Sequence, residues 1–401
     1  MARILILSFF VLFTFPNSYS QAPSTIDFNS GHPGVIENRI DISVSAALAT
    51  DLHLTSGQKM KFQSSQIVVN HSNIMAGEIE LHGASSLNFP RKSYSIKLPE
   101  KVPLTRGDDT VFLKKFYAIS MNMDKDYVRN NIGMEVLKKF NMQVPWHCYS
   151  NLVVNDSSEG VYMVYYPPAN FAIDVCRSPL VMRRGYMEKI ENVHTNDIDP
   201  KIEKSMKKDF NKIYRRIIGS NSGNILYRKL SEKIDLEHYF DWLAFNYIFK
   251  NGDYTDEIYF YWDPTIKKFR LIPWDLDDLF QNIPHEGEAL KEERIGDKLL
   301  FSSEDRLDRE IANDPVLYDA YLKEFRSFLT RFTAGDFQTI LEKVYREVYP
   351  YYQVSEIIGR SRFDKYGLTS TTRLQADLNK ISQSVSLRMF QINNALVKMG
   401  Y

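Results

Sequence analysis

Apolar and polar positions alternate at β-strand spacing in the first quarter of the chain. The runs KFQSSQIVVN, AGEIELHG and KSYSIKL lie between residues 61 and 98 and are separated by Gly, Asn and Pro. Two further apolar runs, YSNLVVN and GVYMVYY, are separated by the polar residues 156 to 159. The pattern predicts a β-rich N-terminal part and a hairpin with a polar turn.

Helical spacing dominates later in the chain. Ile132, Val136 and Phe140 share one face of a helix expected from Val128 to Phe140, and residues 199 to 247 are predicted to be mainly helical. Another helix is expected after Asp314, which suits a cap, with Pro315 in the first turn. A last helix carries Leu374, Leu378, Ile381, Val385, Met389, Ile392 and Leu396. The class is therefore α+β, with a mostly helical C-terminal third.

Two acidic clusters flank one β-hairpin, NGDYTDEIYFYWDPTIKKFRLIPWDLDD, between Asn251 and Asp278. If its strands pair about a centre between Pro264 and Thr265, Asp253 falls opposite residue 276. The open end of the hairpin would then bring Asp253 close to two acids from the other strand, Asp275 and Asp277. The remaining acids nearby are Asp256, Glu257 and Asp278.

Neighbouring carboxylates repel one another and favour a bound cation. Ligands that are all oxygen suit a hard cation such as Mg²⁺, Mn²⁺ or Ca²⁺. A metal beside a separate Asp also suits phosphoryl transfer, where one carboxylate positions the acceptor hydroxyl and another holds the metal. A solvated acidic rim and a structural Ca²⁺ site are the alternatives that the spacing leaves open.

The net charge and the N-terminal segment limit the classes of protein that this sequence fits. Lys+Arg and Asp+Glu are both 50, so the net charge of zero argues against a general nucleic-acid binder. Arg3, the apolar stretch from Ile4 to Phe15 and the Ser18-Tyr19-Ser20 site predict a secretory signal cleaved after Ser20. No later stretch is apolar enough to predict a membrane span. We expect an exported protein, either secreted, periplasmic or at the cell surface.

Two cysteines, Cys148 and Cys176, flank the hairpin with the polar turn. We expect them to lie close enough to bridge; a disulfide and two free thiols both remain open. Two cysteines and scattered histidines make a structural zinc site improbable.

Five motifs, taken in order, resemble the spore coat protein H (CotH) family of atypical secreted protein kinases. They are LHGASSLNFPRKSYSIKL, AISMNMDKDYVRNNIGMEV, VVNDSSEGVYMV, the NGDY…IPWDLD hairpin, and SVSLRMFQI in the last helix. Each motif is weak alone, and the ordered series from Gly77 onward is specific.

The resemblance implies a kinase-like fold, ATP, and Mg²⁺ or Mn²⁺. It assigns Asp253 as the catalytic residue, and Asp275 and Asp277 as metal ligands. Lys97 is the first candidate for the phosphates, since the chain lacks a GxGxxG loop. Arg91 and Lys92 are second choices, and Arg129 matches a family position that braces the cleft or contacts phosphate.

This sequence departs from the family pattern at several positions. His82 stands in place of an Arg, Asp156 in place of a turn Gly, and Tyr165 where an acid is expected. Ile258 replaces an Asn that serves as a second metal ligand, and Glu257 is the candidate substitute.

The expected organisation is a signal peptide (1–20), a β-rich segment (21–76), a CotH kinase-like core (77–290) and a helical part of the same domain (291–401). The expected function is transfer of the ATP γ-phosphate to Ser or Thr of secreted or surface proteins. A catalytically weak or inactive module that binds protein or glycan is the alternative. A two-carboxylate glycosidase has no support from the motif order.

Overall fold

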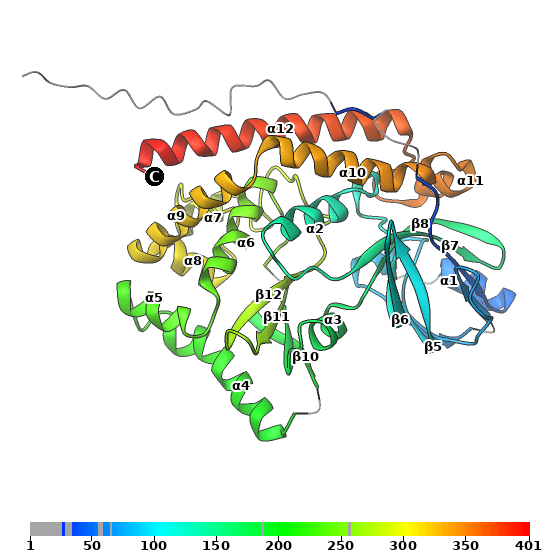
Figure 1. Ribbon diagram of the computed structural model, residues 1–401, viewed down its shortest axis with the longest axis horizontal. Helices are drawn as coiled ribbons and strands as arrows, with labels where there is room; N and C mark the ends of the chain where they lie inside the picture. Colours follow the sequence, from blue (N-terminus) through cyan, green and yellow to red (C-terminus); the bar gives the residue numbers. More distant parts are fainter. Residues whose placement is uncertain are drawn as a thin grey trace, which may run out of the picture.

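A computed structural model describes residues 26–28, 34–54, 59–64, 66–185, 188–196, 198–255 and 258–401. The expected signal peptide and Glu257 lie outside the described residues. Figure 1 shows a β-rich part at one end of the molecule, a helical part at the other, and a small sheet between them. The α+β class is confirmed.

The β-rich part is an eight-stranded sheet with the order β2-β4-β5-β6-β8-β7-β1-β3. Its pairs are antiparallel except for β1 with β7, which is parallel. The predicted N-terminal strands and the hairpin with the polar turn are confirmed. The strands are β1 (Arg39–Ser43), β2 (Lys61–Gln63), β3 (Gln66–Val69), β4 (Glu78–His82), β5 (Ser93–Arg106), β6 (Asp109–Ile119), β7 (His147–Val154) and β8 (Ser157–Tyr165).

The large sheet curls on itself. Its two edge strands are nearly contiguous in sequence, because β2 ends at Gln63 and β3 begins at Gln66. So short a connection spans at most roughly 10 Å, so the two edges must come together. The curled sheet encloses a core of its own, which includes Ile40, Ile96 and Phe116, all 0% exposed.

A second sheet has the order β10-β9-β11-β12 and consists of β9 (Leu180–Gly185), β10 (Lys189–Thr195), β11 (Ile258–Asp263) and β12 (Lys268–Pro273). The predicted hairpin exists, but its expected register was wrong by two positions. Ile258 pairs with Pro273 and Asp263 with Lys268, so the turn is centred between Thr265 and Ile266. Lys267 at the end of the turn has φ 56°. Beyond the strands, Gly252 N donates to Asp278 O at 3.0 Å.

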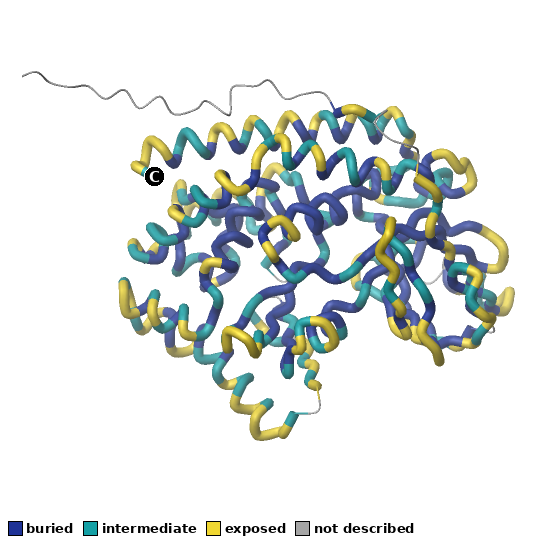
Figure 2. Tube along the Cα trace, in the orientation of Figure 1, coloured by how far each residue is buried: buried dark blue, intermediate teal, exposed yellow. Residues whose placement is uncertain are grey.

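Helices build the rest of the molecule and bury the larger core. Figure 2 shows the buried positions concentrated at the centre of the molecule, around α2, α6 and the small sheet, while α4 is exposed along much of its length. The predicted Asp314 cap is confirmed, since its carboxylate accepts from Val316 N and Leu317 N. The helices are α1 (Ala46–Leu54), α2 (Arg129–Lys139), α3 (Pro168–Asp174), α4 (Pro200–Lys212), α5 (Gly223–Ser231), α6 (Leu236–Phe249), α7 (Glu288–Ile295), α8 (Arg306–Asn313), α9 (Pro315–Arg331), α10 (Ala334–Tyr352), α11 (Ser355–Ile358) and α12 (Thr371–Met399).

The two cysteines are free thiols. Cys148 is buried in β7, and Cys176 Sγ contacts Gln143 Oε1 at 3.8 Å. Burial raises the pKa of both thiols, that of Cys176 to about 12. Among the described residues, no helix combines the length and apolar character needed to cross a membrane.

Candidate active site

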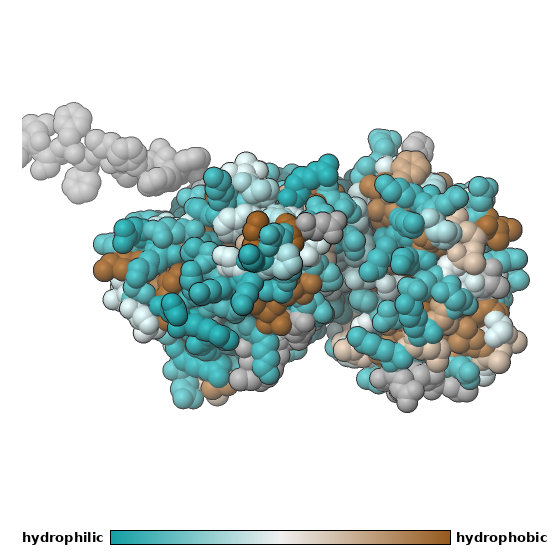
Figure 3. All heavy atoms as spheres, turned by 90° about the horizontal axis from the view of Figure 1, so that it is seen from below, coloured by the Kyte–Doolittle hydropathy of each residue, from teal (hydrophilic) through white to brown (hydrophobic). Residues whose placement is uncertain are grey.

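A cavity of about 620 Å³ separates the large sheet from the helical part. Figure 3 shows the surface hollowed between these two parts of the molecule. One wall comes from β4, β5, β6 and the short turn η1 (Ser85–Asn88), and the other from the segment that follows β12. The volume lies within the range of sites that hold drug-sized or nucleotide-sized ligands.

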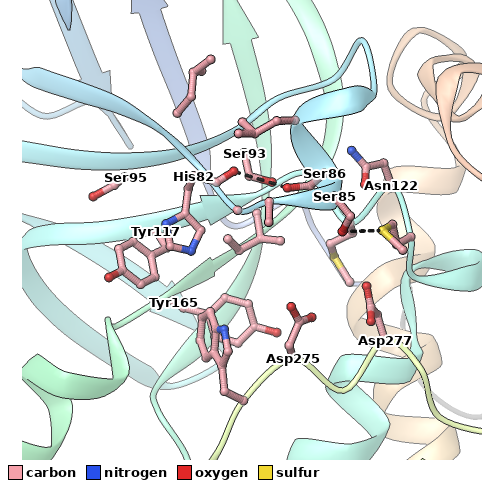
Figure 4. A pocket seen from close by; sticks show the side chains of 18 of the residues that line it. His82, Ser85, Ser86, Ser93, Ser95, Tyr117, Asn122, Tyr165, Asp275 and Asp277 are labelled. Carbon is pink, nitrogen blue, oxygen red and sulfur yellow. Dashed lines mark hydrogen bonds between the residues drawn. The ribbon is translucent and has the colours of Figure 1, made fainter. Parts of the chain in front are cut away.

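Asp275 and Asp277 reach this cavity from the segment after β12. Figure 4 shows both carboxylates at one side of the cavity, with Ser85 and Ser86 across from them. Leu276, between the two acids, is 0% exposed, and its backbone N donates to Asn130 Oδ1 at 2.8 Å. Asp275 has φ 51°, a left-handed conformation that turns the chain here. Burial of Leu276 thus presents the two flanking carboxylates to the same space.

A third carboxylate, Asp124, lies behind this pair. It accepts hydrogen bonds from Arg129 N and Asn130 N, both at 2.9 Å, and burial raises its pKa to about 6. Burial, with Asp275, Asp124 and Asp278 nearby, raises the pKa of Asp277 well above its ordinary value. Such mutual repulsion is relieved by a cation, and an oxygen donor set fits Mg²⁺ or Mn²⁺.

The predicted catalytic residue Asp253 lies opposite Asp278 rather than between Asp275 and Asp277, as the corrected register requires. His285 bridges the two acids, with Nδ1 3.3 Å from Asp253 Oδ1 and Nε2 3.2 Å from Asp278 Oδ2. Hydrogen bonds to these carboxylates raise the pKa of His285 to about 10.

Asp253, Asp278 and His285 are also the one group within the described ranges whose potential ligand atoms lie close enough together to hold a metal. With His285 protonated, this group of two carboxylates and one imidazolium carries a net charge of −1. The second acidic pair, Asp275 and Asp277, lines the cavity, and none of the three residues of this group does.

Lys97, the predicted phosphate ligand, is exposed on β5 and lies outside the residues that line the cavity. Its partner in register on β6, Lys115, does line the cavity, as do Lys59 and Arg183. Ser93 and Ser95, on the same face of β5 as Lys97, also face it. Sequence reasoning missed these three cations because they come from separate strands and loops.

Arg91 and Lys92, the second choices for phosphate binding, are buried at 0% and 2% exposure. Arg91 pairs with Asp364 at 2.5 Å and donates from Nε to Glu159 O at 2.7 Å. Lys92 Nζ donates to Leu87 O at 2.6 Å, which ties β5 to the η1 turn. The Lys92 contact holds the η1 turn, which carries the cavity-lining Ser85 and Ser86, next to the start of β5.

Arg129, the last predicted phosphate contact, is the first residue of α2. Its Nη1 donates to Asp277 O at 3.3 Å, and its guanidinium lies 5.5 Å from the ring centroid of Tyr366. It lines a second cavity rather than the first. Arg129 thus braces the Asp277 segment from outside the main cavity.

Aromatic rings complete the cavity and were not predicted as site residues. His82 and Tyr117 stack with centroids 4.1 Å apart, and Tyr165 packs against Trp274 at 4.9 Å. Burial and the charge of Arg183 lower the pKa of His82 to about 4, so its ring is neutral at pH 7. The buried Tyr165 Oη has no hydrogen-bond partner in the described part of the chain. Flat rings and an unsatisfied hydroxyl suit a planar, polar ligand such as a nucleobase with its sugar phosphate.

Ile258, which stands where the family has a metal-binding Asn, is 0% exposed and opens β11. It pairs with Pro273 and with Arg184, so its side chain belongs to the core of the small sheet. Ile258 is therefore absent from the lining of the cavity that Asp275 and Asp277 reach.

The sequence matches the protein-family model described as CotH kinase protein over residues 79–168 and 176–390, which is most of the chain. A search of curated proteins gave no match. The matched range includes every described residue assigned above to the cavity wall except Lys59.

Two solved structures are similar at low sequence identity. The Helicobacter pylori proinflammatory kinase CtkA is 9% identical, with a TM-score of 0.34 over 75% of this chain and 95% of that chain. The HipA–HipB toxin–antitoxin system of Shewanella oneidensis MR-1 with its operator DNA is 10% identical, with a TM-score of 0.26 over 73% and 65%. At these scores neither likeness supports a statement about activity.

Proposed function

Because this chain belongs to the CotH kinase family, we propose that it is an exported protein kinase that transfers the ATP γ-phosphate to Ser or Thr of secreted or cell-surface proteins. The observation that carries the proposal is that Asp275 and Asp277 line one cavity together with cationic and aromatic side chains. Asp253 lies outside the lining of this cavity and is joined through His285 to Asp278, the residue after Asp277.

The reaction forms a bond between the acceptor oxygen and the γ-phosphorus and breaks the bond from that phosphorus to the β,γ-bridging oxygen, which leaves with ADP. Asp253 orients the acceptor hydroxyl and takes up its proton. The His285 imidazolium fixes the Asp253 carboxylate through the 3.3 Å contact. Catalysis of this kind rests on positioning and charge stabilisation.

Lys115 and Lys59, on the side of the large sheet, and Arg183, on β9 of the small sheet, bring positive charge toward the phosphates. Asp275 and Asp277 would hold Mg²⁺ or Mn²⁺, which neutralises phosphate charge when bound. The unsatisfied Tyr165 Oη offers a hydrogen bond to the ligand. The stacked His82 and Tyr117 rings offer a flat surface for the base.

One observation favours a second candidate, a kinase-like module without catalysis that binds surface protein or glycan. The buried Ile258 removes one metal ligand that the family pattern provides. A site that binds nucleotide through two carboxylates but does not transfer phosphate would fit this candidate.

The test is incubation of the mature protein with γ-labelled ATP and either Mg²⁺ or Mn²⁺, with incorporation of label as the readout. We expect autophosphorylation in wild type and none in Asp253→Asn. Absence of label with both cations, in protein that binds ATP by calorimetry, would overturn the kinase proposal in favour of the non-catalytic module.

A further inference from the structure

A second cavity, of about 400 Å³, shares no lining residue with the first and is strongly cationic. It lies between α12, the start of α2 and the segments that follow α6 and Asp278. Its charged lining residues are Lys125, Arg129, Lys250, Lys380, Arg388 and the single acid Asp377.

One of these five cations forms an ion pair with a carboxylate in the described part of the chain, and Glu288 and Asp124 act on others from outside the lining. Lys125 pairs with Asp377. Across the described ranges, no carboxylate forms an ion pair with Arg129, Lys250, Lys380 or Arg388. Arg129 is only 8% exposed, and its Nε has no hydrogen-bond partner within the described residues. A buried donor without a partner is costly, which points to an anionic ligand.

The cations also act against one another. Burial lowers the pKa of Lys250 and of Arg388, and the charge of Arg388 lowers that of Lys250 further, while the charge of Glu288 opposes both shifts. Arg388 is held in place by Tyr247, whose carbonyl accepts from its Nε at 2.9 Å. A bound carboxylate or phosphate would relieve this repulsion without any rearrangement of the arginine.

The cavity lies next to the proposed acceptor site. Lys250 is three residues before Asp253, at most roughly 11 Å along the chain. Gln281 N donates to Lys250 O at 3.0 Å, and Arg129 Nη1 contacts Asp277 O. An extended peptide rises about 3.3 Å per residue. An acceptor Ser or Thr whose hydroxyl lies at Asp253 would therefore be at most roughly three residues away from the part of the peptide that reaches Lys250 in this cavity.

We propose that this cationic cavity binds an acidic segment of the acceptor protein, with Asp, Glu or phosphorylated residues about three to four positions from the phosphorylated Ser or Thr. The inference rests on the proposed function and adds the class of substrate. The apolar part of the lining supports a peptide over a free ion, because Leu387 is 57% exposed beside Ile381 and Val385. An apolar side chain of the peptide would cover this surface.

The test uses two fluorescein-labelled, extended peptides with one central Ser. One has Asp at the third and fourth positions on both sides, and its twin has Asn there. Anisotropy is measured without nucleotide for wild type, for Lys380→Glu, and for the control Lys204→Glu. Lys204 is exposed on α4, outside the lining of both cavities.

We expect wild type and Lys204→Glu to prefer the Asp peptide by about tenfold or more, with the preference falling at high salt. In Lys380→Glu the preference should fall by about fivefold or more. Competition with inorganic phosphate should require far higher concentrations than competition with unlabelled Asp peptide.

Equal binding of the two peptides by wild type would overturn this inference, whether or not inorganic phosphate binds. Failure of the proposed kinase function has a different signature: no transfer to either peptide, and no nucleotide binding, while the Asp peptide is still preferred. The two failures are therefore distinguishable in one set of samples.

Discussion

Leu276 packs so closely against Gly133 of α2 that a β-carbon at position 133 would lie 2.6 Å from Leu276 Cδ1. The same β-carbon would lie 3.0 Å from Leu279 Cδ1. The absence of a side chain at position 133 therefore sets how deeply Leu276 can be buried. The burial of Leu276 in turn sets where Asp275 and Asp277 point.

Gly133→Ala should accordingly displace the segment that carries both acids. We expect a loss of about 1–3 kcal/mol in the free energy of unfolding, from overpacking, together with weaker Mg²⁺-dependent ATP binding. Urea unfolding and calorimetric titration measure the two effects. Gly335→Ala is the matched control, because its β-carbon would meet only Thr333 Oγ1 at 3.6 Å. Unchanged ATP affinity in Gly133→Ala would show that this packing does not control the site.

Asp253→Asn and Asp275→Asn should both abolish transfer, for different reasons. Loss of a positioned proton acceptor costs about 10²- to 10⁴-fold in rate. Asp253 is assigned to the acceptor hydroxyl and not to the cation, so Asp253→Asn should retain ATP and metal binding. Asp275→Asn removes a cation ligand and should weaken metal-dependent ATP binding as well. Transfer rate and ATP affinity, each with and without Mg²⁺, separate the two variants. Normal transfer by Asp253→Asn would contradict the assignment of the acceptor site.

His285 should remain protonated through the physiological range. Its pKa is raised from 6.5 to about 10, so its contribution to stability is fully present below about pH 6.5 and is lost as the pH rises through 10. The difference in unfolding free energy between wild type and His285→Gln should therefore shrink from pH 7 to pH 10.5. The imidazole signals in NMR spectra should not titrate between pH 6 and 8. A midpoint near 6.5 would mean that the bridge to Asp253 and Asp278 does not form in solution.

Lys115 and Lys97 form a matched pair, since they face each other in register on β6 and β5. Lys115 lines the cavity and Lys97 does not. We expect Lys115→Ala to weaken ATP binding about fivefold or more, and Lys97→Ala to have a smaller effect through longer-range charge. Calorimetric titration with Mg²⁺ and ATP gives both values. A larger loss in Lys97→Ala would return the phosphate role to the residue that the motif favoured.

The sequence predicted those parts of the fold that depend on local pattern. The helix face of Ile132, Val136 and Phe140, the Asp314 cap and the hairpin with the polar turn all follow from neighbours a few residues apart. The hairpin register was missed because the turn is set by Lys267 in a left-handed conformation rather than by Pro264 alone. That shift of two positions moved the partner of Asp253 from residue 276 to Asp278.

Other site features depend on contacts distant in sequence. His285 belongs to no motif, and its role appears only when Asp253 and Asp278 lie on either side of it. Lys59 and Lys115 come from the large sheet and the segment before it, and Arg183 comes from β9 of the small sheet, so their approach depends on how the two sheets pack. No periodicity within one segment encodes that approach.

The place of β1 in the large sheet has a consequence for biogenesis. β1 lies between β3 and β7 and pairs in parallel with β7, so that Ile40 meets Leu152. During synthesis β1 cannot pair with β7 until more than a hundred later residues have left the ribosome. Pairing of such high contact order is slow and leaves an open strand edge in the meantime. We therefore expect the nascent N-terminal part to depend on chaperones until β7 and β8 are complete.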